Sequence, residues 1–213
     1  MVRLTKSQAA EYRSRLSAWQ SFADATELMR EVRERQGFYA VSQGAAKFWR
    51  EMHVALYCAG ITHAKRVRLG DDPPDFELDY GDHRRAFEIV NALPPGRQLG
   101  AEYDAMADLM NTGKSVPITH LDVEGELEDA PLAVDAAIRS KAAKGYEMPL
   151  VLVVDIFHFV IARSDRDAER QWVRSAQKAL GSFIEIWLKN GSDLIRVTPN
   201  GISRLSHPWP AEA

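Results

Sequence analysis

Apolar residues in the first third of the chain recur at the three-to-four spacing of helices. The pattern predicts one long helix from about Thr5 to Arg35, broken at most once, and Thr5 and Gln8 have the spacing of a capping box. A second stripe predicts a helix from about residue 44 to residue 59, with Gly60 ending it. The N-terminal stripe must be covered either by the rest of the chain or by a second subunit. A homodimer formed through this helix is therefore one of two expectations.

The middle of the chain changes to the two-residue period of strands. Strands are expected at about 61–69, 75–80 and 84–92, and Gly81-Asp82 joins the last two in a hairpin. Further along, the pattern predicts helices at about 97–110, 132–145 and 165–180, and strands at about 118–123, 149–155, 183–188 and 194–197. We therefore expect an α/β fold in which a mixed central β-sheet is flanked by helices, with a long N-terminal helical extension.

Composition and charge narrow the class of protein. The 213 residues are 46% hydrophobic and 27% charged, which is typical of a single globular domain. A net charge of -3 argues against a protein that coats nucleic acid by bulk attraction, so any nucleic-acid contact must be local. No run approaches the roughly 20 apolar residues of a membrane span, and the start lacks a secretory signal, so we expect a cytoplasmic protein with no membrane contact. The lone cysteine, Cys58, follows apolar neighbours and is expected in the core.

Acidic residues share one face of the predicted hairpin. Asp75, Glu77 and Asp79 alternate with apolar residues, so their side chains point to the same side. A two-residue turn at Gly81-Asp82 would place Asp75 opposite Glu88, with Cβ atoms about 4.5 to 5.5 Å apart. A four-residue loop would place Glu77 opposite Glu88 and keep every acid on that face. Converging carboxylates repel unless a cation or proton joins them, and Mg²⁺ prefers oxygen ligands together with substrate phosphate. The pattern favours metal-assisted phosphodiester chemistry, and the alternative is an acid-rich face exposed to solvent.

The order of these motifs resembles the PD-(D/E)XK nuclease superfamily, which has the restriction-endonuclease-like fold. The resemblance lies in Glu51 on a helix, Pro74-Asp75 at a strand start, and the acid in the apolar strand Phe87-Glu88-Ile89-Val90. It covers about residues 43–205, and the chain is similar to uncharacterised bacterial endonuclease-like proteins within that superfamily. It implies an N-terminal helical extension over residues 1–42, an endonuclease-like domain over 43–205 and an irregular tail over 206–213.

The resemblance also implies an activity. We expect hydrolysis of phosphodiester bonds in nucleic acid, with DNA as the expected form, with Asp75 and Glu88 binding Mg²⁺ or Mn²⁺, and with Glu51 as a helper from the helix. Val90 stands two residues after the second acid, where the family has a lysine, and valine cannot stabilise a developing negative charge. Either a lysine or arginine reaches in from elsewhere, or the fold is catalytically inactive and serves as a nucleic-acid or protein interaction module.

Basic residues supply candidates for that missing charge and for nucleic-acid contacts. Lys141 and Lys144 lie one turn apart on one predicted helix face and are the candidates by resemblance, with Lys141 as the catalytic choice. Lys65 and Arg97 are candidates by their position beside the acidic hairpin. Contacts to nucleic acid are expected from Arg84, Arg85, Arg97 and Lys144, and the alternative for each is an ordinary solvated charge.

A basic ridge is also expected on the helix at about 165–180. The residues Arg166, Arg170, Arg174 and Lys178 follow one another at a spacing of four. This ridge could track a phosphate backbone, or it could be a solvated helix face balanced by nearby acids.

Overall fold

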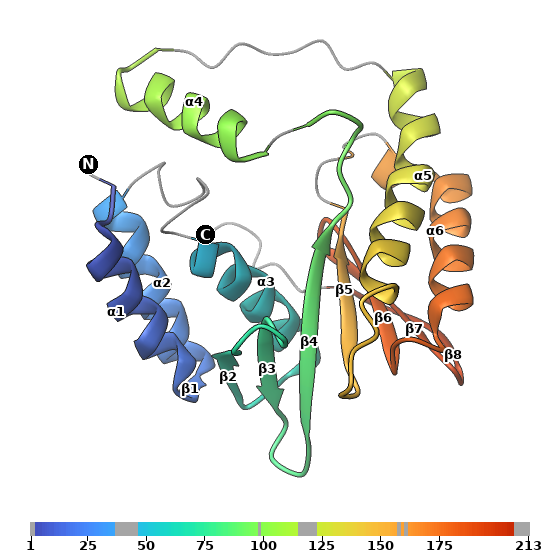
Figure 1. Cartoon of the computed structure of the whole chain (residues 1–213), viewed down its shortest axis with the longest axis horizontal. Coiled ribbons are helices and arrows are strands. Elements are labelled where there is room, and N and C mark those ends of the chain that lie inside the picture. The colour runs from blue at the N-terminus through green and yellow to red at the C-terminus, as the bar shows by residue number, and fades with distance from the viewer. Residues whose placement is uncertain are drawn as a thin grey trace. The chain divides into compact units, whose positions relative to one another are not determined.

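The computed structural model describes residues 3–36, 47–97, 99–114, 123–156, 159 and 162–206 (Figure 1). The chain divides into two compact units, which we describe separately. Unit 1 comprises residues 1–84 and 98–119, and unit 2 comprises residues 85–97 and 120–213. Among the helices in the described part of the chain, none combines the length and the apolar character that crossing a membrane requires.

Unit 1 combines helices with a short antiparallel sheet. Its elements are α1 (Lys6–Ser17), β1 (Gln20–Ser21), α2 (Phe22–Gln36), α3 (Lys47–Thr62), β2 (Arg66–Leu69), β3 (Phe76–Asp79) and α4 (Leu99–Asn111). Strand β2 lies between β1 and β3 and is antiparallel to both, with Val67 paired to Gln20 on one side and Leu78 on the other. Helix α3 packs on β2 and β3, so its apolar stripe and the buried Cys58 form the core of this unit.

The N-terminal helical segment is broken once, as predicted. Thr5 caps α1 in a capping box with Gln8, and the chain passes through β1 before α2 begins. The apolar stripe of both helices is buried within the chain itself, with Leu16, Ala25 and Val32 fully covered. The stripe therefore provides no argument for a second subunit, and the homodimer stays a prediction.

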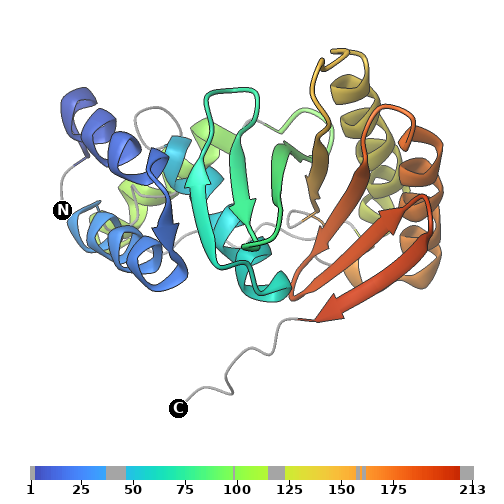
Figure 2. The same ribbon diagram turned by 90° about the horizontal axis from the view of Figure 1, so that it is seen from below.

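Unit 2 is a mixed sheet with helices on one face. Its elements are β4 (Arg84–Asn91), which begins at the last residue of the first segment of unit 1, α5 (Val123–Ala142), β5 (Val151–Asp155), the 3-10 helix η2 (Ala162–Ser164), α6 (Arg166–Ala179), β6 (Glu185–Asn190), β7 (Asp193–Thr198) and β8 (Gly201–Ser206). Strands β4, β5 and β6 are parallel, whereas β7 and β8 continue the sheet antiparallel. The apolar residues Leu152, Val154, Ile186 and Leu188 pack under α5 and α6, which lie side by side on that face (Figure 2).

The predicted α/β class with a mixed sheet is confirmed, and several element bounds were wrong. Helix α3 continues through Gly60 to Thr62 because the buried Ile61 extends its apolar stripe, and β2 therefore starts only at Arg66. Helix α5 begins nine residues earlier than predicted, so Val123 is helical where a strand was expected, and residues 115–122 of that expected strand lie outside the described residues.

Strand β8 was missed altogether. Five of its six residues are exposed, so the sequence has no buried face from which a two-residue period could be recognised. The domain boundaries predicted at residues 42 and 205 stay predictions, and residues 207–213 of the predicted tail lie outside the described residues.

Candidate metal site

Glu88 is a buried acid in the middle of β4. Its neighbour on β5 is Leu152, and its residue is only 1% exposed. Lys141 Nζ donates to Glu88 Oε1, and Tyr146 Oη donates to the same oxygen at 2.9 Å. Lys144 Nζ lies 4.0 Å from that oxygen. One carboxylate oxygen of Glu88 is thus surrounded by two lysines and a hydroxyl group.

The second oxygen of Glu88 has a different environment. Oε2 is buried and accepts no hydrogen bond in the part of the chain that the structure describes. Leaving a carboxylate oxygen without water or a donor costs free energy, because a buried charge must be solvated by its surroundings. A cation at Oε2 would remove that cost. Glu88 therefore has the environment of a ligand whose partner is a positive ion.

Helix α5 brings Lys141 to Glu88. The buried residues Val134, Ala137 and Ile138 form the stripe that packs on the sheet, and Lys141 occupies the next position of the same stripe. Its side chain is only 16% exposed. A positive side chain in the last turn of a helix is also favoured by the helix dipole. Tyr146 follows the helix, and its ring packs against Phe183 with centroids 6.0 Å apart.

Two more acids lie together in unit 1. Carboxylate oxygens of Asp72 and Asp75 lie within 4.8 Å of one another, with Asp75 buried and Asp72 exposed. The loop between β2 and β3 fixes them: Gly70 N–H donates to Asp75 O at 3.0 Å, and Asp72 N–H donates to Pro74 O at 3.1 Å. A Cβ at position 70 would lie 2.1 Å from Pro74 O, so only glycine fits this close approach.

Helix α3 adds a cation and an acid beside this loop. Lys47 Nζ lies 3.1 Å from Glu51 Oε1 and 3.8 Å from Asp72 Oδ2. Burial works to lower the pKa of Lys47, but Glu51, Asp75 and Asp72 outweigh it and raise the pKa above its usual value. Arg13 Nη1 donates to Glu51 Oε2 at 3.0 Å, so each oxygen of Glu51 contacts a cation. This is the salt-bridge environment, and the helper role of Glu51 stays a prediction.

The hairpin turn follows the narrower of the two predicted registers. Tyr80 N–H donates to His83 O at 3.0 Å, which pairs the residues that flank Gly81-Asp82. Gly81 has φ of +98°, a conformation that glycine adopts without strain, and its N–H donates to Asp79 Oδ1 at 2.7 Å. This pairing is the one expected of a two-residue turn.

The predicted nucleic-acid contacts lie in different surroundings. Arg84 belongs to unit 1, where its Nε is 3.5 Å from Asp79 Oδ2. Lys144 is half exposed beside Glu88, Arg97 is half-buried, and Lys65 is exposed next to the turn. These placements do not test the roles assigned to the four residues.

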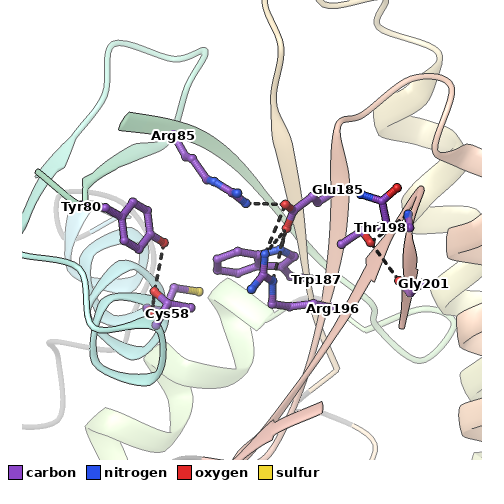
Figure 3. Close-up of polar contacts among 10 residues, drawn as sticks. Cys58, Tyr80, Arg85, Glu185, Trp187, Arg196, Thr198 and Gly201 are labelled. Atoms are coloured by element: carbon purple, nitrogen blue, oxygen red, sulfur yellow. Dashed lines mark hydrogen bonds and ion pairs between the residues drawn. The ribbon is translucent and has the colours of Figure 1, made fainter. Parts of the chain in front are cut away.

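Arg85 takes part in an ion-pair network of unit 2. Its guanidinium donates to Glu185 Oε1, while Trp187 Nε1 donates to Oε2 at 2.7 Å and Arg196 Nη2 donates to Oε2 at 2.9 Å. Figure 3 shows the three side chains converging on Glu185. Burial alone would raise the pKa of Glu185, but the hydrogen bonds from Trp187 and Arg196 hold it below its usual value. Arg85 is therefore engaged with an acid of its own unit.

The predicted basic ridge lies on α6. Asp165 caps this helix, and Trp172 and Ala176 are buried on its other side. The ridge residues are exposed, and Arg170 pairs with Asp167, so the solvated-face interpretation accounts for its geometry.

Comparisons with known proteins leave these observations to stand by themselves. No family model, no curated protein and no solved structure matches this chain.

The prediction missed three residues of this candidate site. Asp72 directly precedes the Pro73-Pro74-Asp75 motif, and this adjacency was a usable signal. Lys47 lies four residues before Glu51, the spacing of a helical ion pair, which was a second signal. Tyr146 stands after the end of a helix, and no pattern in the sequence indicates that its hydroxyl group reaches Glu88.

Proposed function

We propose that this protein is a divalent-metal-dependent nuclease in which Asp75 and Glu88 bind Mg²⁺ or Mn²⁺, with Asp72 as a further acid of the same site. The observation that carries the proposal is the buried oxygen Oε2 of Glu88, which has no hydrogen-bond donor in the described part of the chain. The restriction-endonuclease-like fold inferred from the sequence motifs is part of the same proposal.

The hairpin register supports the proposal. Pairing of Tyr80 with His83 sets a register in which residue numbers of partners sum to 163. Continued along both strands, this register brings Asp75 opposite Glu88, where facing side chains have Cβ atoms about 4.5 to 5.5 Å apart. The chain thus has a local reason to bring the two acids to one cation.

The residues fit a hard divalent cation. Asp72, Asp75 and Glu88 offer only oxygen ligands, which is the chemistry that Mg²⁺ and Mn²⁺ select. A metal bound there would polarise the phosphate group and stabilise the negative charge that develops on it. Hydrolysis adds water across one P–O bond and yields a phosphate monoester and an alcohol.

Lys141 supplies the positive charge that Val90 lacks. Val90 packs against the hydrophobic core of unit 2, so its position faces apolar neighbours. The ammonium group of Lys141 comes from α5 instead and contacts Glu88 Oε1. Placed there, it can orient a water molecule and stabilise an anionic transition state, as the lysine of the resembled family does.

Metal titration and a cleavage assay test the proposal together. Calorimetry with Mn²⁺ and Mg²⁺ is run on wild type, on Asp75→Asn/Glu88→Gln, and on the control Asp167→Asn, which changes an exposed acid of α6. Single- and double-stranded DNA and RNA serve as substrates. We expect wild type and control to bind metal and cut, and the double variant to do neither. Metal binding and cleavage by the double variant would contradict the proposal.

The second candidate function is a catalytically inactive copy of the fold that binds nucleic acid or protein. The observation that favours it is Val90 at the family's lysine position. Lys141→Gln separates the candidates, because an active enzyme should lose about 10²-fold or more in cleavage rate while metal binding persists. Wild type that binds metal and cuts no substrate would favour the inactive copy.

A further inference from the structure

Three arginines surround one tryptophan in unit 1. The guanidinium carbons of Arg68, Arg84 and Arg66 lie 4.7, 5.0 and 5.6 Å from the centroid of the Trp19 ring. Each distance is within the range in which a cation is attracted to the face of an aromatic ring. Trp19 thus gathers three positive groups into one cluster, which we call the Trp19 cluster.

The strand register explains why these residues meet. Arg66 pairs with Ser21 of β1 and with Asp79 of β3, and Arg68 pairs with Glu77. Because side chains alternate along a strand, Arg66 and Arg68 share one face, while Val67 and Leu69 are buried on the other, where α3 packs. The cluster therefore occupies the sheet face opposite the unit's core.

The acids of the cluster lie beneath its arginines. Arg66 Nη2 donates to Asp79 Oδ2 at 2.5 Å, and Arg68 Nη2 donates to Glu77 Oε1 at 2.6 Å. The side chains of Arg66 and Arg84 are 49% and 58% exposed, whereas that of Asp79 is 4% exposed. The N–H of Gly81 and the guanidinium of Arg66 hold the pKa of Asp79 below its usual value, so this acid stays charged at neutral pH. Solvent therefore meets guanidinium groups first.

We propose that the Trp19 cluster binds the phosphate backbone of a nucleic-acid strand. Three guanidiniums against two carboxylates leave one positive charge in excess, and guanidinium forks match the geometry of phosphate oxygens. Trp19 holds the arginines in place, which reduces the entropy lost when they bind. This inference rests on the proposed function, because nucleic acid is its substrate.

The cluster also lies on a path toward the candidate metal ligands. Asp75, Glu77 and Asp79 share one face of β3 and its N-terminal extension. At a rise of about 3.3 Å per residue, Asp75 lies about 13 Å along the strand from Asp79. A strand held by Arg66 and Arg84 would extend from the cluster toward Asp75 within a few nucleotides.

A binding assay with matched variants tests the inference. The probe is a fluorescein-labelled 15-nucleotide DNA strand, and its anisotropy is followed in EDTA at 50 to 300 mM NaCl so that no cleavage occurs. The variants are Arg84→Gln and Arg66→Gln/Arg84→Gln, with Arg66→Lys/Arg84→Lys to keep the charge. The control is Arg30→Gln on α2, an arginine with the same 58% side-chain exposure as Arg84.

The expected result is a loss of affinity specific to the cluster. Arg84→Gln should raise Kd by about fivefold, the double glutamine variant should raise it further, and its salt slope should fall by about 1 to 2, roughly 0.9 for each lost phosphate contact. The lysine variant should recover most of the affinity, and Arg30→Gln should match wild type. Equal affinity of Arg84→Gln, the double glutamine variant and Arg30→Gln would overturn the inference.

The outcome is separable from failure of the proposed function. Arg84→Gln leaves Asp79 paired with Arg66 and Gly81, so it should fold, and circular dichroism checks this. Its Mn²⁺ affinity, measured by calorimetry, should equal that of wild type. If Mn²⁺ does not bind wild type while the strand binds and depends on Arg84, the metal proposal fails and the Trp19 cluster stands. If Mn²⁺ binds and the strand affinity ignores Arg84, only the cluster fails.

Discussion

The two units each build a network of arginines, acids and one tryptophan, and the networks differ in where the charges face. In the Trp19 cluster three arginines pair with Glu77 and Asp79, and Arg66 and Arg84 are about half exposed. In unit 2, Arg85 and Arg196 both donate to Glu185 and are about one quarter exposed. The same residue types form an open network in one unit and a closed network in the other.

The difference shows what exposure does to an ion pair. Arg196 lies 5.2 Å from the centroid of the Trp187 ring, and Trp187 also donates its indole N–H to Glu185, so one acid receives all the donors. An acid and arginines taken out of water depend on one another, whereas exposed pairs exchange partners with solvent at little cost. The closed network should therefore govern stability, and the open network is suited to binding a ligand.

The largest expected effect is loss of the acid at the centre of the closed network. Glu185→Ala leaves Arg85 and Arg196 without their shared partner and should lower the free energy of unfolding by about 3 kcal/mol. Glu77→Ala, the matched change in the open network, should cost less than about 1 kcal/mol. Urea denaturation followed by circular dichroism measures both. Equal losses would show that the two networks do not differ as their exposures indicate.

The pH dependence of stability should differ in the same direction. The pKa of Glu185 is lower in the folded protein than its usual value, so its contribution is complete above about pH 5 and is lost as pH falls through the folded pKa. The stability difference between wild type and Glu185→Gln should therefore shrink on going from pH 7 to pH 3. Denaturation curves at five pH values test this, and a constant difference would argue against the charged form of Glu185 as the stabilising species.

A smaller effect is expected from the aromatic ring of the open network. Trp19→Leu removes the ring that three guanidiniums contact and should lower the free energy of unfolding by about 1 kcal/mol, because exposed cation–π contacts contribute about 0.5 to 1 kcal/mol each and are not additive. Trp19→Phe, which keeps an aromatic face, should lose less. Urea denaturation distinguishes the two variants, and identical losses would assign the effect to packing alone.

The fold could be predicted wherever local pattern and burial agree. Thr5 and Gln8 marked the start of α1, and the apolar run from Leu150 predicted β5. The prediction failed where they diverge: β8 has no buried face, and Gly60 lies inside a helix because Ile61 still packs on the core. Helix ends and exposed edge strands depend on contacts that the sequence pattern does not record.

The candidate site could be predicted only in part for the same reason. The two-residue alternation placed Asp75 with Glu77 and Asp79 on one face, and the resemblance pointed to Lys141. Lys141 also occupies the next position of the buried stripe of α5 after Ile138, a signal that the sequence carried without the resemblance. Tyr146 and Trp19 had no such signal, because one lies beyond a helix and the other before a two-residue strand.

The sequence by itself determined the α/β class, the hairpin with its acids on one face, and the absence of a lysine at position 90, since these follow from spacing and residue type. Tertiary structure decided which charges meet. It brought Lys141 and Tyr146 to one oxygen of Glu88, left the other oxygen buried without a donor, and gathered three arginines around Trp19. Alternation fixes the face on which a side chain lies, whereas its partners come from strand register and helix packing, which join residues far apart in the chain.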